Sequence, residues 1–359
     1  MARFLKTLAL TILLLAGLDL SVAGALRVAE SRGMLTSLVR FFEYGRSVPG
    51  KHAVWQNTLG SVDNPMEASW IDGVLTGPLF YEGATDDPSA LTIRSYGMSF
   101  SANIFRAAVK MDPSLTWDAH VAPAASPNFV YYANQLDRPN RDAGDIVVLS
   151  FLSSSVPGMA SLSNRTWNPE QPMPFTYPIY RAVNGQLQST QPIVTSLEDE
   201  LNPAFRESWN RQLRTEDANY LPIAFAWPAL DRSPFFRLIR RAFTSRQQTK
   251  AKQAILKPEA FPIAETLQLM ALKFAQDARK DGQLPILFLI QGRDPGDVQL
   301  LELLKPVLDA NNIAYLATVE LVDPTNPANF RSDGHYQFIK DDIFAEAFLD
   351  LIKDWTRTP

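Results

Sequence analysis

The stretch LTIRSYGMSFSANIFRAAVKM, residues 91–111, passes from a strand pattern to a helix pattern within three residues. Residues 91–97 form a short strand candidate, and residues 99–111 carry apolar side chains at helical spacing. A second strand and a second helix are expected at 115–122 and 129–137. The next strand, IVVLSFL at 146–152, is almost continuously apolar, as in strands that are buried on both faces. This alternation predicts an α/β sandwich around a parallel sheet.

The same rhythm returns after residue 260. We expect elements that alternate between helix and strand at 264–282, 284–291, 297–312, 313–322 and 339–355. The first of these helices should end at Gly282, and Pro306 should kink or break the second one. The two halves of the sheet domain are therefore assigned to 91–155 and 260–359.

Residues 156–259 interrupt the alternation with prolines and aromatic residues, and are predicted to be a functional cap or insertion. Its aromatic residues are expected to form a small core, with stacking on sugar rings as the alternative: Trp167, Tyr177, Tyr180, Trp209 and Trp227. The segment SPFFRLIRRAF (233–243) predicts an amphipathic helix that starts at a serine cap. A core-facing helix is the favoured interpretation, and a helix on an anionic membrane surface is the alternative.

The N-terminus has the layout of an export or anchoring segment. Arg3 and Lys6 precede an uncharged apolar run, and residues 7–26 contain Asp19 as their only charge. That length is sufficient to span a bilayer, whereas Ala23-Gly24-Ala25 also fits a signal-peptide cleavage site. We favour a retained anchor over residues 1–26, with residues 27–90 as a helical and turn-rich connection. The helix is expected to continue from the anchor with Leu35, Leu38, Val39 and Phe42 on one stripe, and residues 44–90 to form short strands and turns. The positive-inside rule then places the rest of the chain outside the cytoplasmic membrane, in the periplasm, and secretion after cleavage is the alternative.

Composition narrows the function classes. The chain has 34 Lys and Arg against 38 Asp and Glu, a formal net charge of −4, which disfavours a nucleic-acid partner. It has no cysteine, which excludes thiol nucleophiles, disulfides and cysteine-held metals. With three histidines in 359 residues, imidazole chemistry has few places to occur.

One histidine follows the last expected strand, in the loop RSDGHY at 331–336. The carboxyl ends of parallel strands meet at one edge of a sheet, so this loop should approach the serine that follows the first strand. Ser99, His335 and Asp333 would supply a hydroxyl nucleophile, its base and a carboxylate that orients the base. His120 is expected to be a packing residue at a strand end, and the DPGD turn at 294–297 a turn and helix cap rather than a calcium site.

These residues resemble a family. Gly97-Met98-Ser99-Phe100-Ser101 is similar to the first block of the SGNH (GDSL-type) serine hydrolases, and Asp333-Gly334-His335-Tyr336 is similar to the last block of relatives that modify exopolysaccharides. The resemblance covers roughly 91–155 and 260–355. It implies a flavodoxin-like three-layer sandwich with Ser99 as nucleophile, His335 as general base and acid, and Asp333 as the orienting carboxylate.

The sequence departs from the family pattern beside the third strand. Ser154 stands where an asparagine of the family donates a hydrogen bond to the oxyanion. The second-block glycine falls near Ala124 or Ala125, where only a backbone N–H is required, and Ala125 is taken as the candidate. A weakened oxyanion donor costs on the order of 3 kcal/mol of transition-state stabilisation.

The resemblance therefore leads us to expect an extracytoplasmic esterase that acts on a small ester or on O-acyl groups of a polysaccharide. Two alternatives remain: an O-acyltransferase with the same three residues, and a non-catalytic glycan-binding or scaffold subunit. None of these needs a metal or a cofactor, and the membrane contact is expected through the N-terminal helix.

Overall fold

A computed structural model describes residues 1–34, 45–61, 66 and 91–357. Its centre is a five-stranded sheet in the order β2-β1-β3-β6-β7, and all neighbouring strands are parallel. The strands are β1 (Leu91–Gly97), β2 (Leu115–Val121), β3 (Ile146–Leu152), β6 (Leu284–Ile290) and β7 (Ala314–Ala317). The α/β prediction is confirmed at this level, including the fully buried β3.

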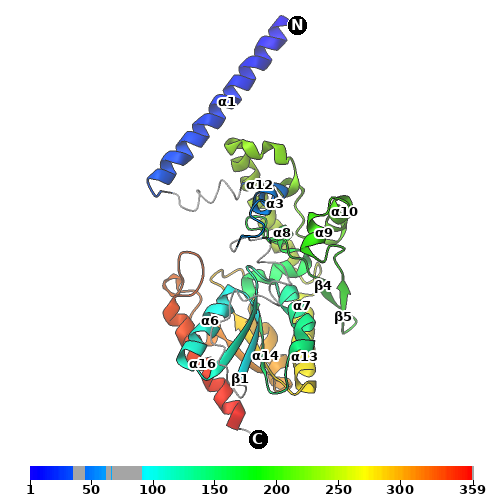
Figure 1. The fold of residues 1–359 in the computed structure, drawn as a ribbon, viewed down its shortest axis with the longest axis vertical. Helices are drawn as coiled ribbons and strands as arrows, with labels where there is room; N and C mark the ends of the chain where they lie inside the picture. The colour runs from blue at the N-terminus through cyan, green and yellow to red at the C-terminus, as the bar shows by residue number, and fades with distance from the viewer. Residues whose placement is uncertain (35–44, 62–65, 67–90, 358–359) are drawn as a thin grey trace.

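Helices cover both faces of the sheet (Figure 1). On one face α6 packs against α16, and on the other α7 and α13 pack against β3 and β6. The bounds of these helices, with α14 beside β6 and β7, are α6 (Ser99–Met111), α7 (Pro127–Asp137), α13 (Ile263–Lys280), α14 (Leu300–Ala310) and α16 (Phe338–Arg357). Phe105 of α6, Phe288 of β6 and Phe348 of α16 stack in the core of the first face, with ring centroids 5.0–5.3 Å apart.

Three local predictions need correction. The helix α14 continues through Pro306 without a break and begins at Leu300, not at 297. The expected strand at 313–322 ends at Ala317, where the chain turns into α15 (Thr318–Leu321); the buried Thr318 at this turn accepts a hydrogen bond from Gln291 N. Residues 48–56, expected as strands and turns, form α3 (Val48–Gln56), which is capped by Ser47.

Residues 156–259 lie over the carboxyl ends of the strands (Figure 1). They fold into short elements followed by one long helix: η3 (Ser153–Ala160), α8 (Asn164–Trp167), β4 (Ile179–Val183), β5 (Gln186–Thr190), α9 (Leu197–Leu201), α10 (Arg206–Glu216), α11 (Pro222–Phe225), η4 (Pro228–Arg232) and α12 (Pro234–Ile255). A 3-10 segment, η2 (Arg138–Asn140), follows α7, and another, η5 (Pro327–Asn329), lies in the last loop. Of the five aromatic residues expected in the core of the insertion, Trp167, Tyr177 and Trp209 are buried, Tyr180 is half-buried and Trp227 is exposed.

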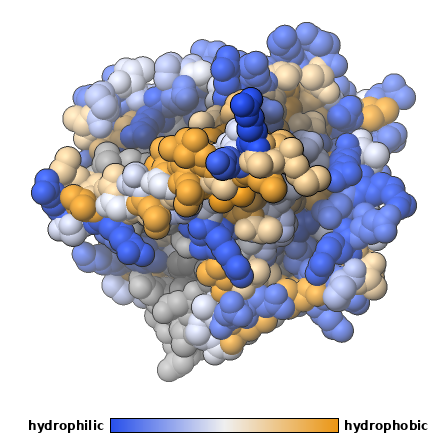
Figure 2. All heavy atoms as spheres, turned by 90° about the horizontal axis from the view of Figure 1, so that it is seen from above, coloured by the Kyte–Doolittle hydropathy of each residue, from blue (hydrophilic) through white to orange (hydrophobic). Residues whose placement is uncertain are grey.

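The N-terminal helix α1 (Ala2–Ser31) projects from the top of the molecule. It is long and apolar enough to cross a membrane or to act as a signal sequence. Seen from above, hydrophobic side chains gather over this helix (Figure 2). The continuation of the helical stripe to residues 35, 38, 39 and 42 lies outside the described residues.

Candidate functional site

The turn from β1 into α6 requires a glycine. A Cβ added to Gly97 would lie 2.2 Å from Ser101 Oγ and 3.0 Å from Ser150 Cβ of the neighbouring strand. Met98 follows in an extended conformation and is the N-cap residue of α6, and its backbone N–H donates to Ser101 Oγ over 3.1 Å. Ser99 therefore occupies the first position of α6, where helix N–H groups lack intrahelical acceptors and favour negative charge.

The loop after β7 brings His335 to this serine. Ser99 Oγ lies 2.7 Å from His335 Nε2, although the two residues are 236 positions apart in the chain. The loop closes through hydrogen bonds from Arg331 N to His335 O and from Gly334 N to Arg331 O. Gly334 has φ +92°, a conformation that side chains other than glycine adopt at a cost.

Asp333 lies on the other side of the imidazole ring. Its Oδ1 is 3.3 Å from His335 Nδ1 and accepts a hydrogen bond from the His335 backbone N–H over 3.1 Å. Slight burial raises the pKa of Asp333, but this N–H and the charges of His335 and Arg331 outweigh it and hold the pKa below its ordinary value. The charge of Asp333 therefore favours the tautomer with the proton on Nδ1, which leaves Nε2 as an acceptor for the serine hydroxyl; Nδ1 itself is near this carboxylate but makes no hydrogen bond to it.

Two aromatic residues fix the position of the histidine. Phe100 stacks on His335 with ring centroids 4.4 Å apart. The neighbouring Tyr336 is fully buried, and its hydroxyl donates to the carbonyl of Gln291 at the end of β6 over 2.6 Å. The sequence motif contains both residues, but only the structure shows that they hold the imidazole.

The oxyanion candidates are less closely joined to this group. Ser154 is exposed in the first turn after β3, and Ala125 is fully buried in the loop after β2. Among the described residues, neither makes a recorded hydrogen bond to Ser99 or His335. Both nevertheless follow strands that end at the same edge of the sheet as Ser99.

The sequence did not lead us to expect that Asp297 would contact the end of β3 through Ser153. The turn predicted at 294–297 is present, since Gly296 N donates to Asp294 Oδ1. In addition, Ser153 Oγ donates to Asp297 Oδ2 over 3.1 Å and accepts from Gly292 N. Burial raises the pKa of Asp297 to about 6. Its place in the loop after β6, at the edge of the sheet where Ser99 lies, was the available signal.

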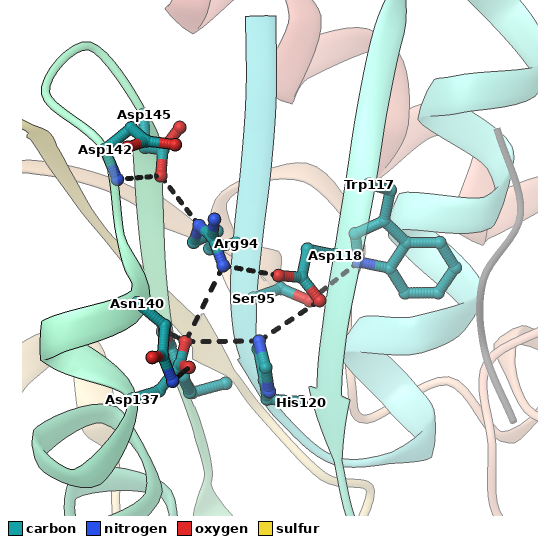
Figure 3. Close-up of polar contacts among 10 residues, drawn as sticks. Arg94, Ser95, Trp117, Asp118, His120, Asp137, Asn140, Asp142 and Asp145 are labelled. Atoms are coloured by element: carbon teal, nitrogen blue, oxygen red, sulfur yellow. Dashed lines mark hydrogen bonds and ion pairs between the residues drawn. The ribbon is translucent and has the colours of Figure 1, made fainter. Parts of the chain in front are cut away.

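A second polar cluster lies on the α7 side of β1 (Figure 3). Arg94 donates to Asp118 over 2.6 Å and to Asp145 over 2.7 Å. His120 Nε2 is 3.2 Å from both Asp118 and Asp137, and the ring is 2% exposed. The prediction that His120 is a buried packing residue is confirmed.

This second cluster is largely buried: His120 and Asp137 are nearly inaccessible, and the side chains of Arg94 and Asp118 retain 14% and 15% of their accessible surface. Tyr96 stacks on His120 with centroids 4.9 Å apart and donates a hydrogen bond to Asp137. Within the described ranges, no group of three His, Asp or Glu side chains is arranged to hold a metal ion. The accessible histidine with a hydroxyl partner is therefore His335.

Comparisons with family models, with curated proteins and with solved structures found no match for this chain.

Proposed function

We propose that this protein is an SGNH-type serine esterase with Ser99, His335 and Asp333 as its catalytic residues. The observation that carries the proposal is the 2.7 Å approach of Ser99 Oγ to His335 Nε2 at the carboxyl edge of a parallel sheet. The strand order and the helices on both faces support a flavodoxin-like sandwich, the architecture that the family resemblance implies.

In this proposal Ser99 Oγ attacks the acyl carbonyl while its proton passes to His335 Nε2. The carbon–oxygen bond to the alcohol then breaks, and the alcohol leaves with that proton. Water next gives a proton to His335 and attacks the acyl-enzyme, which releases the carboxylic acid and restores the serine hydroxyl. The N-terminus of α6 faces the developing oxyanion, and Ser154 and the Ala125 N–H are the proposed additional donors.

The open site suits a large acylated substrate. Ser99 is exposed, and the side chain of His335 retains 23% of its accessible surface. We propose an extracytoplasmic location, with α1 as the membrane anchor and an O-acylated polysaccharide or a small ester as the substrate.

Labelling with a fluorophosphonate probe tests the nucleophile. The full chain in detergent should be labelled at Ser99, and both Ser99→Ala and His335→Ala should abolish the labelling. Ser332→Ala is the matched control, because Ser332 is an exposed serine in the loop that carries His335. The Ser332→Ala variant should be labelled as fast as the wild-type protein.

A folded wild-type chain that the probe does not label would overturn the esterase proposal and favour the glycan-binding alternative. Labelling that persists in Ser99→Ala would place the nucleophile elsewhere. If Ser99 is labelled, products formed with and without a glycan acceptor separate the esterase from the O-acyltransferase, since water and a sugar hydroxyl compete for the same acyl-enzyme.

A further inference from the structure

The polarity of helix α12 is reversed relative to that of a core-facing helix. Arg237 and Arg240 are 8% and 2% exposed, whereas Phe243 is 55% exposed. Phe235 and Phe236 are half-buried. A surface helix ordinarily buries its apolar stripe and exposes its charges, so the core-facing interpretation of this segment is wrong.

The arginines face inward because a buried carboxylate holds them. Arg240 and Arg237 both donate to Asp231, to its carboxylate and its carbonyl respectively. The same carboxylate accepts from Ser47 Oγ over 2.7 Å. Arg240 also donates to the carbonyl of Trp227 over 2.9 Å. This network fixes the orientation of α12 with its arginines inward, which leaves Phe235 and Phe236 half-buried and Phe243 exposed.

The outward side continues into the turn before α12. Trp227 and Leu230 are 61% and 43% exposed, and the Trp227 ring contacts Phe236. Trp227 has φ +50°, a left-handed conformation that costs a residue other than glycine about 1–2 kcal/mol. The exposed Trp227 ring adds a large apolar surface next to the start of α12.

The membrane-length helix α1 meets α12 at this point. Asp19 accepts hydrogen bonds from Ser233 Oγ over 2.7 Å and from the Phe235 backbone N–H over 3.0 Å. The contact stripe on α1 continues through Val22, Ala23 and Leu26, which are partly covered. The one charge within residues 7–26 is thereby satisfied by the N-terminus of α12.

The position of Asp19 sets the depth of α12. A hydrocarbon core of about 30 Å needs about 20 helical residues, which is the length of the segment 7–26, with Asp19 as its only charge. Asp19 then lies about 10 Å inside the boundary of the hydrocarbon core near Leu26, at about 1.5 Å per residue. Helices that lie in a membrane surface are buried to a similar depth, about 5–10 Å.

Charge favours a lipid surface over an apolar protein surface. From Trp227 to Lys252 the only acidic residue is Asp231, which is already paired. Arg232, Arg246 and Lys250 are exposed along the same segment. Exposed cations beside exposed aromatic residues are typical of helices that bind anionic headgroups.

We propose that residues 227–243 dock into the surface of an anionic bilayer, with Asp19 of α1 as the contact that sets their depth. The proposal requires that α1 is retained, and it is independent of any chemistry at Ser99. Docking at two places, through α1 and through α12, would hold the carboxyl edge of the sheet in a fixed orientation relative to the membrane.

Single-cysteine labelling tests this docking, and the chain has no native cysteine to interfere. Full-length Trp227→Cys and Phe243→Cys, each carrying an NBD fluorophore, are placed in nanodiscs of phosphatidylethanolamine and phosphatidylglycerol. Lipids with a doxyl quencher near the headgroup should reduce NBD emission about twofold or more, because both positions lie at the headgroup and acyl boundary. Leu136→Cys is the control, since Leu136 is exposed to a similar degree on the sheet domain and should not be quenched.

Asp19 variants test the depth contact. Asp19→Leu should keep the protein in the nanodisc but lower the quenching at position 243, and Asp19→Asn, which keeps an acceptor, should restore part of it. If doxyl lipids quench NBD at position 243 no more than at position 136, the proposal is overturned. NBD emission that is blue-shifted but not quenched by doxyl lipids would indicate that a protein, not the bilayer, covers this surface. If the intact mass of the protein in the membrane fraction lacks residues 1–25, α1 is not retained and the proposal is wrong.

Discussion

Two histidine–carboxylate pairs lie beside strand β1. Their nitrogen–oxygen distances are nearly equal, but their exposure and their neighbours differ. His335 lies 3.3 Å from Asp333 at the end of the strand, and His120 lies 3.2 Å from Asp118 on its α7 side. The first pair is accessible and has a serine hydroxyl within hydrogen-bond distance. The second is buried, and its neighbours are Arg94 and an aromatic ring.

The difference shows what a histidine–carboxylate pair needs in order to serve catalysis. Both imidazoles are oriented by a carboxylate, so orientation alone does not distinguish them. Of these two histidines, only His335 lies within hydrogen-bond distance of an exposed serine hydroxyl, which is at the N-terminus of a helix. The buried pair instead contributes to an ion network that is expected to stabilise the sheet.

Substitution of each histidine by glutamine should separate the two roles and gives the largest expected effect. His335→Gln should lower kcat for an ester substrate about 10³-fold or more, because the serine loses its base. The melting temperature of this variant should change little, since the His335 side chain is partly exposed. Ester hydrolysis and thermal unfolding measure the two effects.

His120→Gln should give the opposite pattern, with a lower melting temperature and nearly normal hydrolysis at a temperature where the variant is folded. Loss of hydrolysis in His120→Gln at such a temperature would break the comparison, because it would connect the buried pair to the reaction.

Arg94→Met tests the buried network directly. It leaves the carboxylates of Asp118 and Asp145 without their main cation. Because these pairs are partly buried, the loss should lie between the roughly 1 kcal/mol of an exposed pair and the roughly 3–5 kcal/mol of a fully buried one. Urea unfolding measures the loss. Arg211→Met is the matched control: its pair with Glu207 is exposed and should contribute less than about 1 kcal/mol. Equal losses in the two variants would contradict the stabilising role of the Arg94 network.

The sequence was sufficient to predict the sheet and the Ser99–His335 contact for a physical reason. Parallel strands end at one edge, so residues that follow two strand ends meet there whatever their separation in the chain. The Arg94 network was beyond such reasoning, because it depends on register. Arg94 pairs with Asp118 and Tyr96 with His120 only because β1 and β2 align at Leu91 and Leu115.

Helix α12 shows a different limit. Its periodicity correctly predicted a helix with an apolar side and an arginine side, but periodicity does not say which side faces the protein. That choice depends on Asp231, a buried carboxylate that the linear pattern did not single out.

The prediction of the oxyanion donors has a similar limit. Ser154 and Ala125 were assigned from the order of the motifs alone, and no hydrogen bond in the described residues connects them to Ser99.

Asp333→Asn should have a smaller effect on hydrolysis than His335→Gln, about 10²-fold in kcat. The carboxylate orients the imidazole, but its side chain is 51% exposed, so solvent screens its charge more than in a buried triad. The melting temperature should stay close to that of the wild type. A rate within twofold of the wild type would show that the Phe100 stack alone holds the ring.

The smallest expected effect is on the pH dependence of stability. It concerns the carboxylate of Asp341, in the first turn of α16, the helix that follows the His335 loop. Burial raises the pKa of Asp341 to about 7, with a further rise from Asp342 and an opposing effect of Arg331. A raised pKa in the folded state means that the stability from this group is complete below its ordinary pKa of 3.8 and is lost as pH rises through 7.

Asp341→Asn removes that loss, so the variant should be more stable than the wild type above pH 7 by about 1 kcal/mol or more, with the difference shrinking toward pH 4.

Asp118→Asn provides the contrast on the other side of β1. Burial raises the pKa of Asp118, but the hydrogen bond and charge of His120 and the charge of Arg94 outweigh it, and the pKa lies below 3.8. Its stabilising effect is present above that value and is lost as pH falls. Asp118→Asn should therefore be least stable, relative to the wild type, at neutral pH. Urea unfolding of both variants between pH 4 and pH 8 should give differences of opposite sign at neutral pH, and differences of the same sign would show that Asp341 is ionised and paired with Arg331 in the folded protein.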